Sequence, residues 1–106
     1  MKKIVIALAA AGLLATAVTT QAASGEEIYQ QTCKNCHDPA MAAAVKSPAI
    51  GSKEDWAPRI AKGMDALYKS SLEGIAGTAM MARGTCPACS DEDLKAAVDY
   101  MVNASK

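Results

Sequence analysis

The sequence predicts an all-α fold, with about four short helices joined by two long loops. Serine residues followed three positions later by an acidic residue indicate three of the helix starts. Apolar residues recur at intervals of three and four in the last segment, and no segment shows the two-residue alternation typical of a strand. The predicted helices occupy residues 24–33, 52–63, 64–74 and 90–106, and the predicted loops occupy residues 38–51 and 75–89.

The first residues have the three parts of a secretory signal peptide. Lys2 and Lys3 form a basic end, residues 4–18 are apolar, and small residues follow. The apolar run is shorter than the ~20 residues that a bilayer span requires, which disfavours an uncleaved anchor helix. Cleavage after Ala22 puts Thr20 and Ala22 at the two positions where small residues are preferred. We therefore expect a cleaved signal peptide over residues 1–22 and one exported, periplasmic domain without a membrane span over residues 23–106.

The composition argues against nucleic-acid binding and points to a bound cofactor. Without the two signal-peptide lysines, the chain has nine Lys plus Arg against eleven Asp plus Glu, which gives no electrostatic footprint for nucleic acid. The aromatic residues are three tyrosines and one tryptophan, and there is no phenylalanine. A domain this small usually needs a covalent staple or a cofactor. The sequence itself lacks a large apolar group around which a core could form.

The first two predicted helices begin at serine caps. Ser24 and Glu27 have the spacing of a capping box, and Ser52 and Asp55 repeat it. Pro58 is expected to end or kink the first turn of the second helix, because proline lacks an N–H group and its ring clashes with the preceding turn.

The third and fourth helices have clear ends. The third runs from Met64 to Gly74, because glycine suits the left-handed position that follows a helix. The fourth begins at Ser90, with acidic residues in its first turn. Its apolar stripe consists of Leu94, Ala97, Val98, Met101 and Val102.

The stretch "CKNCH" places two thiols, Cys33 and Cys36, next to His37, the chain's only histidine. A zinc site, a dithiol redox pair or a covalent anchor for haem could use these groups. A zinc site would add Cys86 and Cys89, but the two pairs are too far apart for a zinc ribbon, and exported cysteines tend to form disulfides. A dithiol pair lacks the strand–helix alternation of a thioredoxin-like fold and leaves the histidine without a role.

Haem attachment uses every group of this motif. The spacing C-x-x-C-H is a signature of covalent c-type haem, in which each cysteine adds across a vinyl group. Imidazole is the commonest proximal ligand of haem iron. The motif therefore predicts thioether bonds at Cys33 and Cys36, and iron coordination by Nε2 of His37. The porphyrin would then supply the missing apolar mass.

The second iron ligand is expected to be a methionine, because no second histidine exists. Met101 lies on the apolar stripe, Met64 opens a helix, and Met41 follows the motif too closely to reach the other haem face without a tight turn. Met80 and Met81, in the loop "GIAGTAMMARG", are far enough along the chain. Chain position narrows the choice to this pair without separating its members.

From residue 23 onward the chain resembles the bacterial class I c-type cytochromes of the cytochrome c5 family. The matching stretches are "CKNCH", "SPAIG", "WAPRIAKGMDAL" and "AMMARGTCPACSDEDLKAAVDYMV". In that family two prolines and a basic residue follow the axial methionine, before a glycine. This pattern implies Met80 as the ligand and Met81 as the runner-up, with Met81 and Ala82 replacing the prolines. The replacement should loosen the loop and put a competing thioether beside the ligand.

The resemblance implies further roles. It implies a disulfide between Cys86 and Cys89, which would hold the turn between the methionine loop and the last helix. It also implies that the carbonyl of Pro48 accepts the Nδ1–H of His37, which orients the imidazole.

Five other residues have expected packing or cofactor contacts. Gly25, Tyr29 and Tyr100 resemble the residues at which the first and last helices cross in class I cytochromes. Trp56 and Arg59 are candidates for contact with a haem propionate, although a core tryptophan and a solvated arginine are equally compatible with the sequence.

Haem iron with histidine and methionine ligands has no open coordination position. The expected function is therefore one-electron transport by a single haem c, not enzymatic catalysis. Expected partners are respiratory redox proteins, such as a membrane quinol-oxidising complex, a terminal oxidase or a reductase. Residues 34–83 carry two more basic than acidic side chains, which favours acidic partners. If neither methionine bound iron, the alternative would be a haem protein that binds small ligands or reacts with peroxide.

Overall fold

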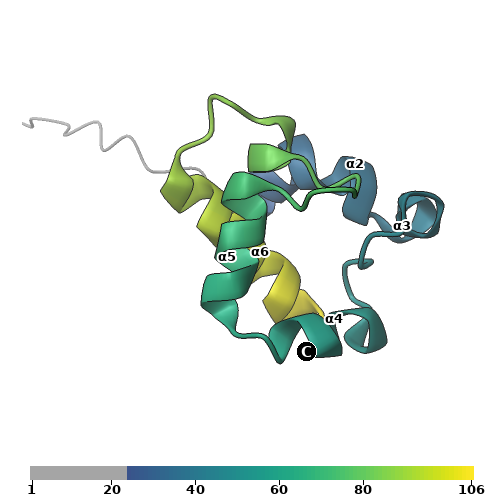
Figure 1. The fold of residues 1–106 in the computed structure, drawn as a ribbon. Helices are drawn as coiled ribbons and strands as arrows, with labels where there is room; N and C mark the ends of the chain where they lie inside the picture. The colour runs from purple at the N-terminus through teal and green to yellow at the C-terminus, as the bar shows by residue number, and fades with distance from the viewer. Residues whose placement is uncertain (1–23) are drawn as a thin grey trace, which may run out of the picture.

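The structure is a computed structural model that describes residues 24–106. All regular elements within this range are helical, so the all-α prediction is confirmed. The first segment is nearly continuous from residue 25 to residue 45, and Figure 1 shows α3 set apart from α5 and α6. The elements are α1 (Gly25–Ile28), the π-helical turn η2 (Tyr29–Cys33), α2 (Lys34–His37), α3 (Pro39–Val45), α4 (Lys53–Ile60), α5 (Met64–Glu73), the 3₁₀ turn η3 (Ala82–Thr85) and α6 (Asp91–Ala104).

The helices α1 and α6 cross in close contact. A Cβ atom at Gly25 would lie only 2.2 Å from the carbonyl oxygen of Ala96, so a side chain at this position is excluded. One turn further along, the rings of Tyr29 and Tyr100 are 5.5 Å apart between centroids and tilted by 46°. The expected packing of the first helix on the last therefore depends on a missing side chain and an aromatic pair.

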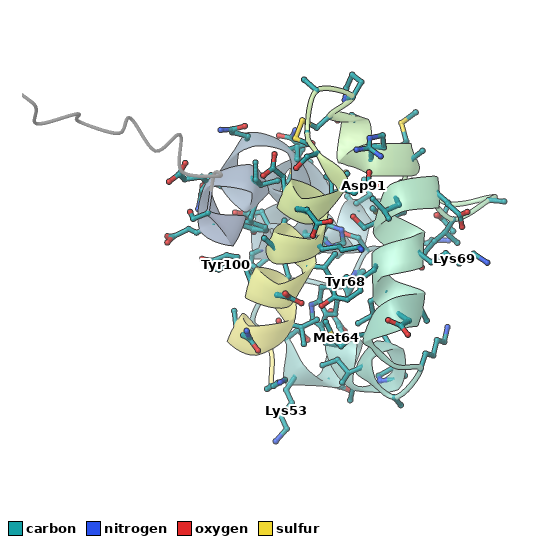
Figure 2. The ribbon with its side chains drawn as sticks, turned by 90° about the vertical axis from the view of Figure 1, so that its left-hand side faces the viewer. Lys53, Met64, Tyr68, Lys69, Asp91 and Tyr100 are labelled. Atoms are coloured by element: carbon teal, nitrogen blue, oxygen red, sulfur yellow. A yellow bond between two sulfur atoms is a disulfide. The ribbon has the colours of Figure 1, made fainter. Side chains whose placement is uncertain are left out.

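The hydrophobic core forms where α6 lies between the first helical segment and α5, as Figure 2 shows. All five residues of the predicted α6 stripe are at least 96% buried. Tyr29 and Trp56 form one cluster with the last three residues of this stripe, and Leu67 and Tyr68 of α5 pack against its edge; the first two stripe residues pack with Ile28 and Cys89. The amphipathic pattern of residues 91–104 thus determines which face of α6 is covered.

The three predicted serine caps are present, but only one is reciprocal. The hydroxyls of Ser24 and Ser52 each accept from the backbone N–H three residues later, at 3.2 Å. Ser90 does the same, and the Asp93 carboxylate also accepts from the Ser90 N–H, which completes a capping box. The Asp55 carboxylate instead accepts from the N–H of Ala49 and ties α4 to the preceding loop.

One local prediction is wrong, and of the two effects expected of Pro58, a helix end or a kink, the helix end is excluded. The segment 38–51, predicted as a loop, contains the helix α3. This helix is capped by the Asp38 side chain, which accepts from the Ala40 N–H, and Pro39 lies in its first turn. An aspartate before a proline and a run of alanines is a helix start, so the signal was present in the sequence. Pro58 does not end α4, because the N–H of Ala61 still donates to the carbonyl of Ala57 and the Arg59 guanidinium donates to the carbonyl of Asp55.

The predicted signal peptide, residues 1–22, lies outside the described residues. Within residues 24–106, no helix is long and apolar enough to cross a membrane.

Candidate functional site

A cavity of about 490 Å³ opens beside the "CKNCH" motif. Cys33, Cys36 and His37 line it together with Met80 and Met81, although these groups are more than forty residues apart in the sequence. Its lining is predominantly apolar, and its volume lies in the range of ordinary cofactor sites. The fold therefore brings both halves of the predicted site to one cavity.

The local helix geometry places the motif on the cavity wall. Cys33 closes the π-helical turn η2, and Cys36 and His37 follow in α2, at three and four residues further on. Residues three and four apart lie on one helix face. The sequence spacing alone therefore turns all three side chains toward the same space.

The two motif cysteines are free thiols, and both are partly buried. Burial, with a smaller effect of Cys36, raises the pKa of the Cys33 thiol to about 11. Thiol–disulfide exchange requires a thiolate, so a thiol with this pKa is poorly suited to a dithiol redox role. The pair remains available for covalent attachment of a cofactor.

The imidazole of His37 is buried and oriented by the backbone. Its Nδ1 is 2.8 Å from the carbonyl oxygen of Pro48, to which it donates, so Nε2 remains free to coordinate a metal. Burial lowers the pKa of His37; the Pro48 hydrogen bond acts in the opposite direction, and the charge of Arg59 lowers the pKa further. The neutral form, which is the form that ligates metal, is therefore favoured.

Residues 47–50 form hydrogen bonds to the backbone of the segment that carries His37. The Ile50 N–H donates to the carbonyl of His37 at 2.8 Å, and the Ser47 hydroxyl donates to the carbonyl of Cys36. Trp56 is 96% buried; its Nε1 donates to Ala49 at 2.9 Å, and its ring centroid is 6.0 Å from that of the imidazole. Trp56 is therefore part of the hydrophobic core. Trp56 and Arg59 also line the cavity.

The methionine loop is the segment 74–81 that follows α5. Gly74 has φ +75°, and a Cβ atom there would lie 2.7 Å from the backbone nitrogen of Ala82. The loop returns because the Ile75 N–H donates to the carbonyl of Met80 at 2.9 Å. Met80 is partly buried, whereas Met81 is 61% exposed.

The other methionines are placed differently. Met41 is 48% exposed and Met64 packs at the edge of the core; neither lines the cavity. Met101 lines the cavity as well, but it is 96% buried within the core cluster of α6. The structure therefore leaves the same two candidates, Met80 and Met81, on the loop.

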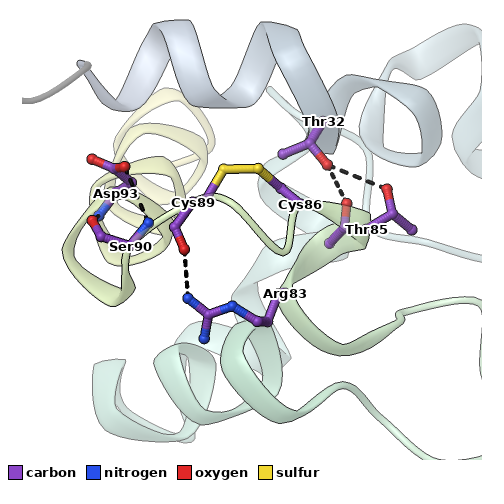
Figure 3. Close-up of a disulfide and its surroundings, with 8 residues drawn as sticks. Thr32, Arg83, Thr85, Cys86, Cys89, Ser90 and Asp93 are labelled. Carbon is purple, nitrogen blue, oxygen red and sulfur yellow. Dashed lines mark hydrogen bonds between the residues drawn. A yellow bond between two sulfur atoms is a disulfide. The ribbon is translucent and has the colours of Figure 1, made fainter.

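A disulfide joins Cys86 to Cys89 between the methionine loop and α6 (Figure 3). These sulfurs are consequently unavailable to a zinc site, and no cluster of three metal-binding side chains of the His, Cys, Asp or Glu type occurs in the part of the chain that is described. Arg83 links the same region, since its guanidinium donates to the carbonyl of Cys89 at 2.6 Å and to the carboxylate of Asp91 at 2.8 Å.

Sequence reasoning missed three residues that shape this site. Thr32, Ser47 and Arg83 each bind the backbone or a side chain of a segment that lines the cavity. Ser47 and Arg83 lie in stretches that match the family, but the matches do not reveal their hydrogen bonds; Thr32 belongs to no such stretch, because a bond between segments 52 residues apart leaves no spacing pattern in the sequence.

The residues present fit a covalently attached haem. Two free thiols with the C-x-x-C spacing, a neutral imidazole with a free Nε2 and a nearby thioether surround one apolar cavity. These are the donor types that c-type cytochromes use. The basic side chains of Lys46, Arg59 and Lys62 also line the cavity and suit the two carboxylates of a haem.

Comparisons with known proteins point to the same class. Residues 20–101 match the family described as cytochrome c oxidase, cbb3-type, subunit III. Cytochrome c-555 of Chlorobaculum thiosulfatiphilum is 41% identical over 87 residues, which cover 80% of this chain and 98% of that protein. Cytochrome c5 of Azotobacter vinelandii is 38% identical over 82 residues, covering 76% of this chain and 93% of that protein.

A solved structure is also similar. It is described as an electron transfer complex of nitrite reductase with cytochrome c; the matching chain is 39% identical, with a TM-score of 0.66 over 77% of this chain and 94% of that chain. Fold and site thus define a haem protein of the electron-transport class. The chain belongs to the class I c-type cytochromes of the cytochrome c5 kind, and it binds covalently attached haem c.

Proposed function

We propose that the protein is a periplasmic one-electron carrier in which Cys33 and Cys36 bind haem through thioethers. In this proposal Nε2 of His37 and the thioether sulfur of Met80 are the two axial ligands. One observation carries it: a single cavity is lined by the whole C-x-x-C-H motif and by Met80. The signal-like residues 1–22 support export to the periplasm.

The bound haem supplies a metal that cycles between ferric and ferrous states. The chain's own residues determine the environment of that metal. The Pro48 carbonyl accepts from Nδ1 of His37 and so increases the basicity of Nε2. Apolar lining residues such as Leu67 and Val98 exclude water and disfavour the extra charge of the ferric state.

The exposure of the two loop methionines supports Met80 over Met81. An iron ligand must turn toward the cavity, and Met80 is the more buried of the two. Met81 also lines the cavity but is 61% exposed, so it is the less enclosed of the two. The proposed ligand set leaves no open position, which favours electron transfer over ligand binding.

The exposed lining residues of the cavity suggest how a partner docks. Lys46 and Lys62 are exposed and basic, while Ile75 and Met81 are exposed and apolar. Such a mixture suits a small, transient contact with an acidic face of another redox protein. A nitrite reductase is the partner of the similar cytochrome, and here we propose a respiratory redox protein such as a reductase, a terminal oxidase or a membrane quinol-oxidising complex.

Expression with haem-attachment machinery tests this function. The exported protein should carry one haem by mass spectrometry and give a low-spin ferric spectrum with a methionine–iron charge-transfer band. Met80→Ala should abolish the band, and the matched control Met81→Ala should retain it. A high-spin wild-type spectrum would contradict the carrier function, whereas a band that survives only in Met80→Ala would move the ligand to Met81.

A further inference from the structure

Thr32 is a buried polar residue at an unusual place in the chain. It directly precedes Cys33, the first cysteine of the haem motif, and its side chain is 92% buried. Its hydroxyl donates to the carbonyl of Gly84, 52 residues further along the chain. The hydroxyl of Thr85 is also nearby, at 3.4 Å (Figure 3). Thr32 therefore connects the haem-motif segment to the turn that follows the methionine loop.

That turn has an unfavourable backbone conformation, although the N–H groups of Gly84 and Cys86 donate to the carbonyls of Met81 and Arg83. Arg83, Gly84 and Thr85 have φ angles of +59°, +56° and +67°, so three successive residues are left-handed and only one is glycine. Left-handed backbone is unfavourable for residues with a Cβ atom and persists only where surrounding contacts enforce it. The conformation of the turn must therefore be maintained from outside.

Two contacts enforce it. Arg83 binds the start of α6 through the carbonyl of Cys89 and the carboxylate of Asp91, but both charged side chains are substantially exposed. A surface ion pair of this kind contributes little. The Thr32 hydrogen bond is partly buried, because Thr32 itself is 92% buried while Gly84 is half-buried, and an unpaired carbonyl in such a place is costly.

The position of this turn, residues 83–85, determines where Met80 lies. The Gly84 N–H donates to the carbonyl of Met81, and the backbone of Met80 and Met81 packs against Gly74. Displacement of the turn therefore moves the methionine loop relative to the wall that carries Cys33 and His37.

We propose that Thr32 is a positioning residue for Met80: its hydroxyl holds the methionine loop closed over the haem cavity. This proposal rests on the proposed function, in which Met80 is an iron ligand. The hydrogen bond sets the distance between the two chain segments that grip the cofactor. It thereby replaces part of the rigidity that the loop lacks where Met81 and Ala82 follow the ligand.

Displacement of the methionine by added imidazole measures loop closure directly. Imidazole reaches ferric iron only when the loop is open, so its apparent Kd equals the intrinsic Kd divided by the open fraction. Thr32→Val replaces the hydroxyl with a methyl of similar size. We expect it to raise the open fraction and lower the apparent Kd for imidazole about tenfold, which corresponds to about 1.4 kcal/mol.

Three matched variants separate positioning from general destabilisation. Ser105→Ala removes a 99% buried hydroxyl that bonds to Met101 and Gly51, remote from the loop in the sequence. It should lower resistance to urea unfolding while leaving the apparent Kd within about twofold. Thr85→Val keeps the β-branch in the same turn but removes the hydroxyl that lies 3.4 Å from that of Thr32, so it should lower the Kd by less than Thr32→Val does. Thr32→Ser keeps the hydroxyl and should restore the wild-type Kd.

Each outcome decides the question. Equal Kd values for Thr32→Val, Ser105→Ala and wild type would overturn the role of Thr32, even with the methionine–iron band intact. Absence of that band in the wild-type protein would instead reject Met80 ligation itself. If Thr32→Val does not mature, Thr32→Ala removes the same hydroxyl and is expected to give the same shift.

Discussion

The two walls of the cavity are held in different ways. On the histidine wall, residues 33–50, the hydrogen bonds join residues that are close in sequence, such as His37 to Pro48 and Ser47 to Cys36. On the methionine wall, residues 74–89, Asp91 is also close in sequence to its partner Arg83, but Thr32 binds the turn from a segment 52 residues away. Contacts between residues close in sequence form together with their own segment. A contact between distant segments can break while both segments stay folded, and the wall then opens. We therefore expect the methionine wall to open first.

Gly74→Ala should have the largest effect, because it combines a disfavoured φ of +75° with a Cβ atom only 2.7 Å from the Ala82 nitrogen. We expect it to lower the free energy of unfolding by about 2–4 kcal/mol and to weaken the methionine–iron band. Gly77→Ala is the matched control, since Gly77 has φ +77° but open space for a Cβ atom, and should cost only about 1 kcal/mol. Urea titration of the holoprotein measures both. Equal losses in the two variants would refute the close-approach argument.

Removal of the Cys86–Cys89 disulfide should act on one wall alone. Replacing both cysteines by alanine frees the short loop that precedes α6, at a cost of about 2 kcal/mol from chain entropy. Arg83 binds the carbonyl of Cys89, and Thr32 binds the carbonyl of Gly84. Loss of the disulfide should loosen the segment between these two contacts, so the apparent affinity for imidazole should rise as well. Mass spectrometry should still find one haem, since Cys33 and Cys36 are unchanged. An unaltered imidazole affinity in this variant would mean that the disulfide does not hold the loop.

Ser47→Ala is the matching change on the histidine wall. It removes the hydroxyl that donates to the carbonyl of Cys36 and should lower the free energy of unfolding by about 1 kcal/mol. Because the methionine loop does not depend on this bond, imidazole affinity should stay within about twofold of the wild-type value. A large gain in imidazole affinity would show that the two walls are not independent.

The smallest effect is expected at Tyr68, which links α5 to α6 outside both walls. Its hydroxyl donates to the carboxylate of Asp99, and this hydrogen bond is the main cause that raises the pKa of Tyr68 above its usual value near 10. The protonated phenol is the form that gains, so this stabilisation is present below about pH 10 and is lost as pH rises through the raised pKa. Asp99→Asn should lower the pKa in an ultraviolet titration and leave imidazole affinity unchanged. Identical titrations for wild type and variant would exclude the link.

Much of the fold could be predicted because its signals are local. The apolar stripe of α6 repeats at helical spacing, and the caps at Ser24, Ser52 and Ser90 are short patterns with a direct physical cause. The errors were local too. The start of α3 at Asp38 was overlooked, and the effect of Pro58 was overstated because the loss of one hydrogen bond does not end a helix whose next bonds are intact.

The sequence by itself determined the chemistry of the site and the common face of its three motif residues. Cys33, Cys36 and His37 lie on one helix face because of their spacing, a consequence of helical geometry that needs no other part of the chain. The tertiary structure alone decided the methionine wall. The unequal exposure of Met80 and Met81 and the close approach of Gly74 to the backbone of residues 80–82 depend on the path of the loop, and the bond from Thr32 to Gly84 joins segments distant in sequence. Such contacts depend on the packing of the whole domain, and packing leaves no periodic signal in the sequence.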